Sequence, residues 1–261
     1  MSTISNRRSY ILTGVALAIM ALTWLILVLM HPEDQWDSLA QGPGAVVALL
    51  GFSLGAIVAL VAVIPVLHPR ALALIPVALV LNIVLGQIVG TNPLPIPLYL
   101  DSIGTVLVAA LCGPRAGMAT GALSALVWGT FNPTVVPFAA DYAMIGLLAG
   151  LAPWVTRRWL VPIWGAFVGL LSALMAAPIA SFIFGGTAGT GTGLLVSFYR
   201  QLGLSPMSAV YAQSLSSDPI DKVIVFSLVL LIVAALPKRT MREFRPKDAA
   251  PKAVAPKTTA A

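Results

Sequence analysis

Four charged residues, Asp101, Asp141, Asp221 and Lys222, stand near the ends of apolar segments, where they could bind a polar ligand. Asp218 and the proline after it are typical of a helix start, with aspartate as the N-cap. This start places Asp221 and Lys222 in the first turn, where a cation opposes the helix dipole, so Lys222 needs a carboxylate partner or a ligand. We expect Asp101, Asp141, Asp221 and Lys222 to cluster at the mouth of a cavity, either as a ligand site or as a structural charge network. Asp101 also fits a helix N-cap.

Uncharged polar side chains add a second set of candidates. Asn82 lies near the middle of the apolar segment 71–90, and Gln87 follows five residues later. Polar residues inside apolar spans either line a functional cavity or form hydrogen bonds between helices. The glycine-rich segment 185–193 contains Thr187 and Thr190 and predicts either a flexible lid with hydroxyl groups for a ligand or a simple linker. It is not a P-loop, because no Gly-Lys-Ser/Thr follows.

Catalytic chemistry finds little support in the sequence. The two histidines, His31 and His68, lie outside the apolar segments, so a serine–histidine dyad within a span is excluded. No spacing typical of metal ligands occurs. The single cysteine, Cys112, excludes an intrachain disulfide. We therefore expect no enzyme, no catalytic residue, no metal and no cofactor.

The composition identifies the protein class. Of the 261 residues, 59% are apolar and 9% are charged, against roughly 45–50% and about 25% in soluble proteins. So few charged side chains cannot cover a soluble surface, and so apolar a chain is not disordered. The sequence predicts an all-α membrane protein with several spans.

Apolar segments predict about eight transmembrane helices. Five are long enough to cross a bilayer, which takes about 20 residues, and three are shorter. The long ones are 9–30, 45–67, 71–90, 160–184 and 219–236, and the short ones are 98–112, 117–131 and 139–155. The short pair within 98–131 either crosses twice or forms a re-entrant hairpin. Two crossings are preferred, because a hairpin would bury Arg115 in hydrocarbon at a cost of several kcal/mol.

The distribution of basic residues predicts the orientation. With eight crossings and a cytoplasmic N-terminus, thirteen of the fifteen lysines and arginines lie in inner loops or in the tail. The other two are Arg200 and Lys222. Both termini are therefore predicted to be cytoplasmic.

The same pattern divides the chain into three parts. Residues 1–70 form a pair of spans joined by an acidic external loop, residues 71–237 form a six-helix core, and residues 238–261 form a disordered basic tail. Such a tail is attracted to anionic lipid of the bilayer. The excess of positive charge thus reflects membrane topology, and we expect no nucleic-acid partner.

Small residues at four-residue spacing form two stripes. They permit close approach of another helix, either within the chain or from a partner subunit. The stripes are Gly113, Gly117, Gly121 and Ala125, and more loosely Ala78 and Gly86.

Four short motifs carry a resemblance to a known family. They are Leu-Asn-Ile-Val-Leu-Gly at 81–86, Tyr-Leu-Asp-Ser-Ile-Gly-Thr at 99–105, Cys-Gly-Pro-Arg-Ala-Gly at 112–117 and Asp-Pro-Ile-Asp-Lys at 218–222. With them, residues 71–236 resemble the S-component, the substrate-binding membrane subunit, of energy-coupling factor (ECF) transporters. The two N-terminal spans depart from the basic pattern of that family.

The resemblance implies a six-helix bundle in a bacterial-type plasma membrane that captures a vitamin or a related small molecule from outside. Its implied partners are a transmembrane T subunit, which small residues would contact, and two cytoplasmic ATPases that drive uptake. By position, the implied ligand-binding residues come from the outer loops and later helices. They are Asn82, Tyr99, Asp101, Asn132, Asp141, Tyr142, Thr187, Thr190 and Lys222, with Asp221 in the same cluster.

Two other functions remain open from the residues. A sensory or regulatory membrane module would be supported by a fused signalling domain, against which the disordered tail argues. A self-sufficient secondary transporter would need a charged relay or an inverted repeat, and neither is evident.

Overall fold

The protein is helical throughout the part that the structure describes. The computed structural model describes residues 3–30, 42–90, 96–186 and 192–237, with Arg239 and Phe244. The elements are α1 (Thr3–Leu29), α3 (Pro43–Val63), η1 (Ile64–Val66), α4 (Pro69–Gly90), α5 (Ile103–Cys112), α6 (Pro114–Trp128), η2 (Pro133–Phe138), α7 (Ala139–Ala149), α8 (Leu160–Phe184), α9 (Thr192–Gln201) and α10 (Pro206–Ala235). The predicted all-α class is confirmed for these residues. The acidic loop and nearly all of the tail lie outside them.

Four helices, α1, α3, α4 and α8, are long and apolar enough to cross a membrane. Their outer faces carry large hydrophobic side chains, and Leu22, Leu50, Val77 and Ile163 are each more than half exposed. A surface of this kind is stable in contact with lipid, so the chain is a membrane-integral protein. The total of eight spans stays a prediction, because α5 has ten residues and is only about 15 Å long.

The last long helix begins earlier than predicted. We expected it to start at Pro219, but α10 starts at Pro206, after Ser205, whose hydroxyl accepts a hydrogen bond from the Ser208 amide at 3.3 Å. The helix continues through Pro219, which lies against Gly169 of α8. Neighbouring helices make prolines tolerable inside membrane helices. The prediction that Asp218 is an N-cap is therefore wrong, and the charged residues of α10 lie inside the helix.

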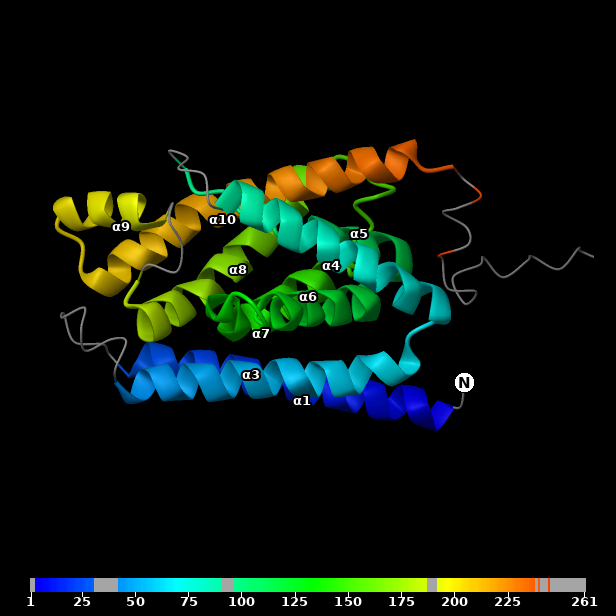
Figure 1. Cartoon of the computed structure of the whole chain (residues 1–261), viewed down its shortest axis with the longest axis horizontal. Helices are drawn as coiled ribbons and strands as arrows, with labels where there is room; N and C mark the ends of the chain where they lie inside the picture. The colour runs from blue at the N-terminus through cyan, green and yellow to red at the C-terminus, as the bar shows by residue number, and fades with distance from the viewer. Residues whose placement is uncertain are drawn as a thin grey trace, which may run out of the picture.

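The helices run roughly side by side along the long axis of the molecule (Figure 1). The pair α1 and α3 covers one side of the bundle, where α3 packs against α6, α7 and α8. The start of α1 and the end of α10 lie at the same end of the molecule (Figure 1). The sequence predicted these two helices as an N-terminal appendage, and the division of the chain at residue 70 stays a prediction.

Glycines bring two pairs of helices into backbone contact. A Cβ atom added to Gly117 of α6 would lie 2.4 Å from the Gly146 carbonyl oxygen of α7, and one added to Gly121 would lie 2.0 Å from that of Tyr142. On α8, Gly165 and Gly169 meet α10 in the same way. Small residues thus set the spacing of both pairs.

The residues predicted to dock a partner subunit pack mainly within the chain. Gly117, Gly121 and Ala125 are buried, the first two against α7. The backbone of Ala78 lies against Gly104 of α5, and Gly86 lies against Trp128 and Asp101. Gly113, in the turn before α6, is partly exposed and has φ of +91°, which favours glycine. Five of the six residues thus pack inside the bundle, and contact of these stripes with a partner subunit stays a prediction.

Substitution at the α6–α7 contact tests this packing. Gly117→Ala places a methyl group against the α7 backbone, so we expect a loss of about 1–3 kcal/mol in stability, measured as a lower melting temperature of the purified protein. Gly14→Ala is the matched control, because nothing lies within 4 Å of the added Cβ and alanine favours a helix. Equal melting temperatures of the Gly117→Ala variant and the unsubstituted protein would contradict the contact.

Candidate ligand-binding site

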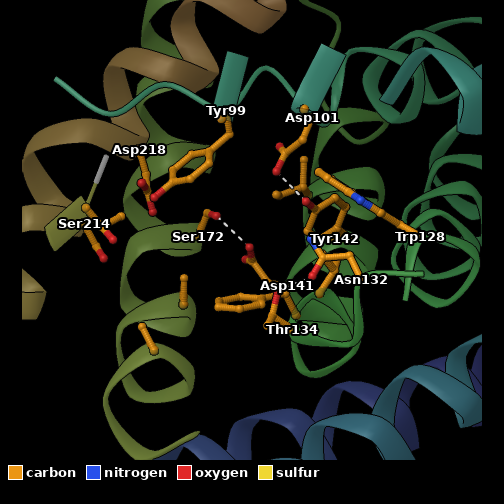
Figure 2. A pocket seen from close by; sticks show the side chains of 18 of the residues that line it. Tyr99, Asp101, Trp128, Asn132, Thr134, Asp141, Tyr142, Ser172, Ser214 and Asp218 are labelled. Atoms are coloured by element: carbon orange, nitrogen blue, oxygen red, sulfur yellow. Dashed lines mark hydrogen bonds between the residues drawn. The ribbon is translucent and has the colours of Figure 1, made fainter. Parts of the chain in front are cut away.

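A cavity of about 260 Å³ lies among α4, α6, α7, α8 and α10 and is lined by both polar and aromatic side chains (Figure 2). It reaches Gly90 at the end of α4 and Asn132 just after α6. The opposite end of the bundle is marked by Arg115, which donates a hydrogen bond to Asn6 of α1 at 3.1 Å. The volume is near the lower end of the roughly 300–1,000 Å³ found for small-molecule sites.

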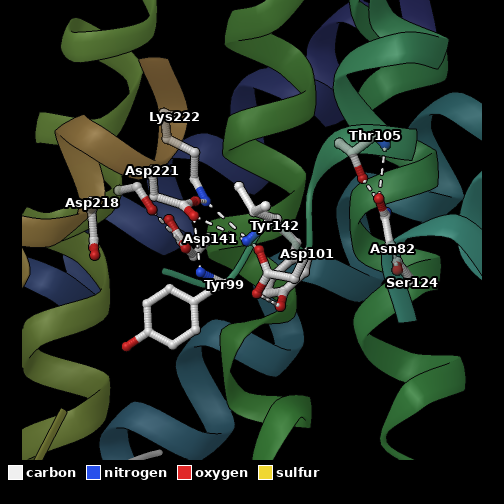
Figure 3. A network of polar contacts seen from close by, with 12 residues as sticks. Asn82, Tyr99, Asp101, Thr105, Ser124, Asp141, Tyr142, Asp218, Asp221 and Lys222 are labelled. Carbon is white, nitrogen blue, oxygen red and sulfur yellow. Dashed lines mark hydrogen bonds and ion pairs between the residues drawn. The ribbon is translucent and has the colours of Figure 1, made fainter. Parts of the chain in front are cut away.

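One buried lysine organises the wall formed by α10 (Figure 3). Lys222 is 4% exposed, and its ammonium donates to Asp221 Oδ2 at 2.7 Å. It also lies 3.7 Å from Asp101 Oδ1. A buried ammonium is stable only when it is paired, and here two carboxylates pair with it.

Asp221 also fixes the backbone that enters the site. Its Oδ1 accepts hydrogen bonds from the Tyr99 and Leu100 amides, both at 2.9 Å. Leu100 has φ of +50°, a left-handed conformation that costs energy for a leucine. These bonds hold the turn in which Tyr99 and Asp101 point their side chains at the cavity (Figure 2).

The turn is tied to α7 as well. The Tyr142 hydroxyl donates a hydrogen bond to Asp101 Oδ2. The Tyr99 phenol on the same turn carries a hydroxyl that can donate a hydrogen bond to a ligand.

Two further carboxylates face the cavity from α7 and α10. Asp141 Oδ2 accepts a hydrogen bond from Ser172 at 2.9 Å, and Asp218 Oδ1 accepts one from Ser217 at 2.9 Å. Neither forms an ion pair within the described part of the chain. The Oδ1 atom of Asp141 is buried and has no hydrogen-bond partner among the described residues.

Asn82, a predicted ligand residue, does not line the cavity. Its amide nitrogen donates to Thr105 Oγ1 at 2.8 Å and to Ser124 Oγ at 3.2 Å. Its oxygen accepts from the Gly104 and Thr105 amides at 2.6 and 3.3 Å. Asn82 thus caps the N-terminus of α5 from α4 and joins three helices.

The prediction that Asp101 caps α5 is wrong, since residue 102 holds the N-cap position and makes no side-chain cap.

The remaining predicted residues divide into three groups. Tyr99, Asp101, Asn132, Asp141, Tyr142 and Lys222 line the cavity. Asp221 lies behind the cavity wall and holds the turn and the lysine. The lid residues Thr187 and Thr190 lie outside the described residues.

The sequence interpretation missed several residues of the site, above all Ser214 and Asp218. Ser214, Asp218 and Lys222 are spaced by four residues, so they share one face of α10, and all three line the cavity. This spacing was visible in the sequence but was interrupted by the proposed helix start at 219. Trp128 and Phe138, which form aromatic walls, carried no signal in the sequence that distinguished them from ordinary apolar residues.

Comparison of the chain with known protein families, curated proteins and solved structures finds no match. The function is therefore inferred from the residues and their geometry.

The role of Asn82 is testable with a pair of amide-to-leucine substitutions. Asn82→Leu leaves two backbone amides and two hydroxyls without their partner, so we expect a loss of several kcal/mol, at about 1–3 kcal/mol for each buried unsatisfied group. Gln201→Leu, the control, replaces an amide side chain at the exposed end of α9, outside the cavity lining, and should shift stability by about 0.5 kcal/mol at most. The melting temperatures of both variants, measured by thermal unfolding, test this expectation. An Asn82→Leu protein with normal stability but no ligand binding would assign Asn82 to the ligand site.

Proposed function

We propose that the chain is the substrate-binding subunit of an ECF-type importer in a bacterial-type plasma membrane. It captures a vitamin or a related small molecule from outside the cell for uptake driven by partner subunits. The observation that carries the proposal is the cavity, because it encloses buried charged side chains within an apolar helical protein. Ionisable groups buried in a membrane protein are costly and mark functional sites.

The shape of the cavity supports capture of a ligand. Its walls are mostly buried side chains, such as Asp141 and Tyr142, whereas Gln87 and Thr134 on its lining are exposed. A ligand that enters past these exposed residues would be surrounded by protein. This arrangement is typical of a binding subunit.

The energy for uptake is expected from other chains. The sequence contains no P-loop, so ATP hydrolysis requires the two ATPase subunits and the T subunit implied by the resemblance. The loaded chain would bind these partners in the membrane. Uptake then depends on a shift between ligand-binding and ligand-releasing states.

Binding and transport should separate experimentally. The purified chain alone should bind its ligand, found by a melting screen of vitamins and precursors, because ligand at 100 times its Kd stabilises by about 2.7 kcal/mol. Cells should accumulate that ligand only when T subunit and active ATPases are present. When the ATPases are mutated in their P-loop, we expect uptake to be lost and ligand binding by the purified chain to stay unchanged. Binding that requires the ATPases would contradict the proposal.

A self-sufficient secondary transporter is the second candidate, favoured by the carboxylates that line the cavity, because they could bind a coupling proton. Uptake of the ligand into liposomes that contain only the purified chain distinguishes a secondary transporter from a binding subunit. Accumulation of ligand driven by a pH gradient, with no other subunit present, would replace the first proposal with this one.

The orientation of the cavity is open to labelling. In a Cys112→Ser background, Thr134→Cys should react with a membrane-impermeant maleimide in intact cells, because we place the cavity mouth outside. Arg157→Cys, between α7 and α8, should react only after permeabilisation. The reverse pattern would place the mouth in the cytoplasm and exclude capture from outside.

A further inference from the structure

The charges around the cavity do not balance. Three carboxylates line it, from Asp101, Asp141 and Asp218, and Lys222 is the one cationic side chain in the described lining. The Lys222 ammonium is already in contact with Asp221 at 2.7 Å and with Asp101 at 3.7 Å. Asp141 and Asp218 therefore face the cavity without a direct ion pair among the described residues.

The Asp141 carboxylate can accept a further hydrogen bond. It is 5% exposed, and its only described hydrogen bond leaves Oδ1 buried and unpartnered. Two other buried polar residues close to the cavity, Asn82 and Asp221, use both of their polar side-chain atoms in hydrogen bonds within the chain. A buried carboxylate oxygen without a donor is unfavourable, so a group that enters the cavity with a positive charge or an N–H would be strongly attracted.

The aromatic walls add a shape requirement. Tyr99, Trp128, Phe138 and Tyr142 all line the same space, and aromatic faces favour planar rings and cations. The indole Nε1 of Trp128 is buried without a described partner, so it can donate to an acceptor on the ligand. The cavity volume of about 260 Å³ admits a small ring compound.

We infer that the ligand is a small organic cation with a planar nitrogen heterocycle. Its positive charge or charged N–H group binds between Asp141 and Asp218, and an acceptor atom on it meets the Trp128 indole. The inference rests on the proposed binding function and specifies its substrate class. An anionic ligand is disfavoured, because the Lys222 ammonium is already paired with the carboxylates of Asp221 and Asp101.

Matched compounds of different charge test the inference on the purified full-length chain. Each set keeps one ring and changes the charge. The probes are 1-methylnicotinamide, nicotinamide and nicotinate; pyridoxamine, pyridoxine and 4-pyridoxate; and the 5-aminomethyl and 5-hydroxymethyl derivatives of 4-amino-2-methylpyrimidine. Melting shifts and calorimetric Kd values at neutral pH rank them, and mass spectrometry identifies any compound that co-purifies with the protein.

We expect the tightest binder, or the co-purified compound, to be a cation. Its affinity should fall about 30-fold or more in Asp141→Asn and in Asp218→Asn, because each removes a buried charge partner. Trp128→Phe should weaken binding less, since it keeps the ring. Ser227→Ala, on α10 but outside the cavity lining, is the control and should bind normally. Melting of each variant without ligand shows that it is folded, and Asp218→Asn carries the test if Asp141→Asn does not fold.

Three results would overturn the inference: a neutral or anionic compound that binds best, a cation whose affinity is unchanged in both aspartate variants, or no binding by any cation of the panel and none co-purified. The proposed function is judged separately. A neutral compound that binds tightly and enters cells only with active ATPases would refute the cation and leave the importer subunit standing. If the chain alone binds a cation and accumulates it in liposomes, the cation stands and the importer subunit is refuted.

Discussion

The buried ammonium of Lys222 is the constraint on which the site depends. A lysine at this depth needs carboxylate partners, and they come from its own helix and from the turn before α5. The helix partner, Asp221, uses its second oxygen to hold the amides of that turn, including Leu100 in its left-handed conformation. That turn presents Tyr99 and Asp101 to the cavity. Pairing one cation thus positions two walls of the site.

Close helix contacts determine which residues are free to face the cavity. On α10, Pro219 and Val223 lie against Gly169 and Gly165 of α8, and any side chain at those glycines would collide with the α10 backbone. The α10 residues on the neighbouring face, among them Lys222, then point into the cavity (Figure 3). The same small residues that allow close packing therefore orient the charged residues of the site.

The sequence predicted helices better than it predicted the roles of polar residues. Hydropathy alone yielded α8 with its observed bounds, because its 25 residues contain no charge that interrupts the pattern. It could not yield α10, since Pro219 ends a helix in water but not beside a packed neighbour. A polar residue in an apolar span either faces a ligand or forms hydrogen bonds between helices, and the sequence does not distinguish the two. For Asn82 the positions of its four hydrogen-bond partners show the second role. The glycine stripe at Gly117 and Gly121 had the same ambiguity.

The buried polar groups fall into two classes, and the difference bears on function. Asn82, Asp221 and Lys222 have partners within the chain, so they stabilise the fold whether or not a ligand is present. Asp141 is nearly as deeply buried, yet one of its oxygens has no partner among the described residues. A fold selected for stability alone would fill that position with an apolar residue of similar size, which avoids the desolvation penalty. An unpartnered acceptor in a cavity wall therefore supports the proposed binding of a donor from outside the chain.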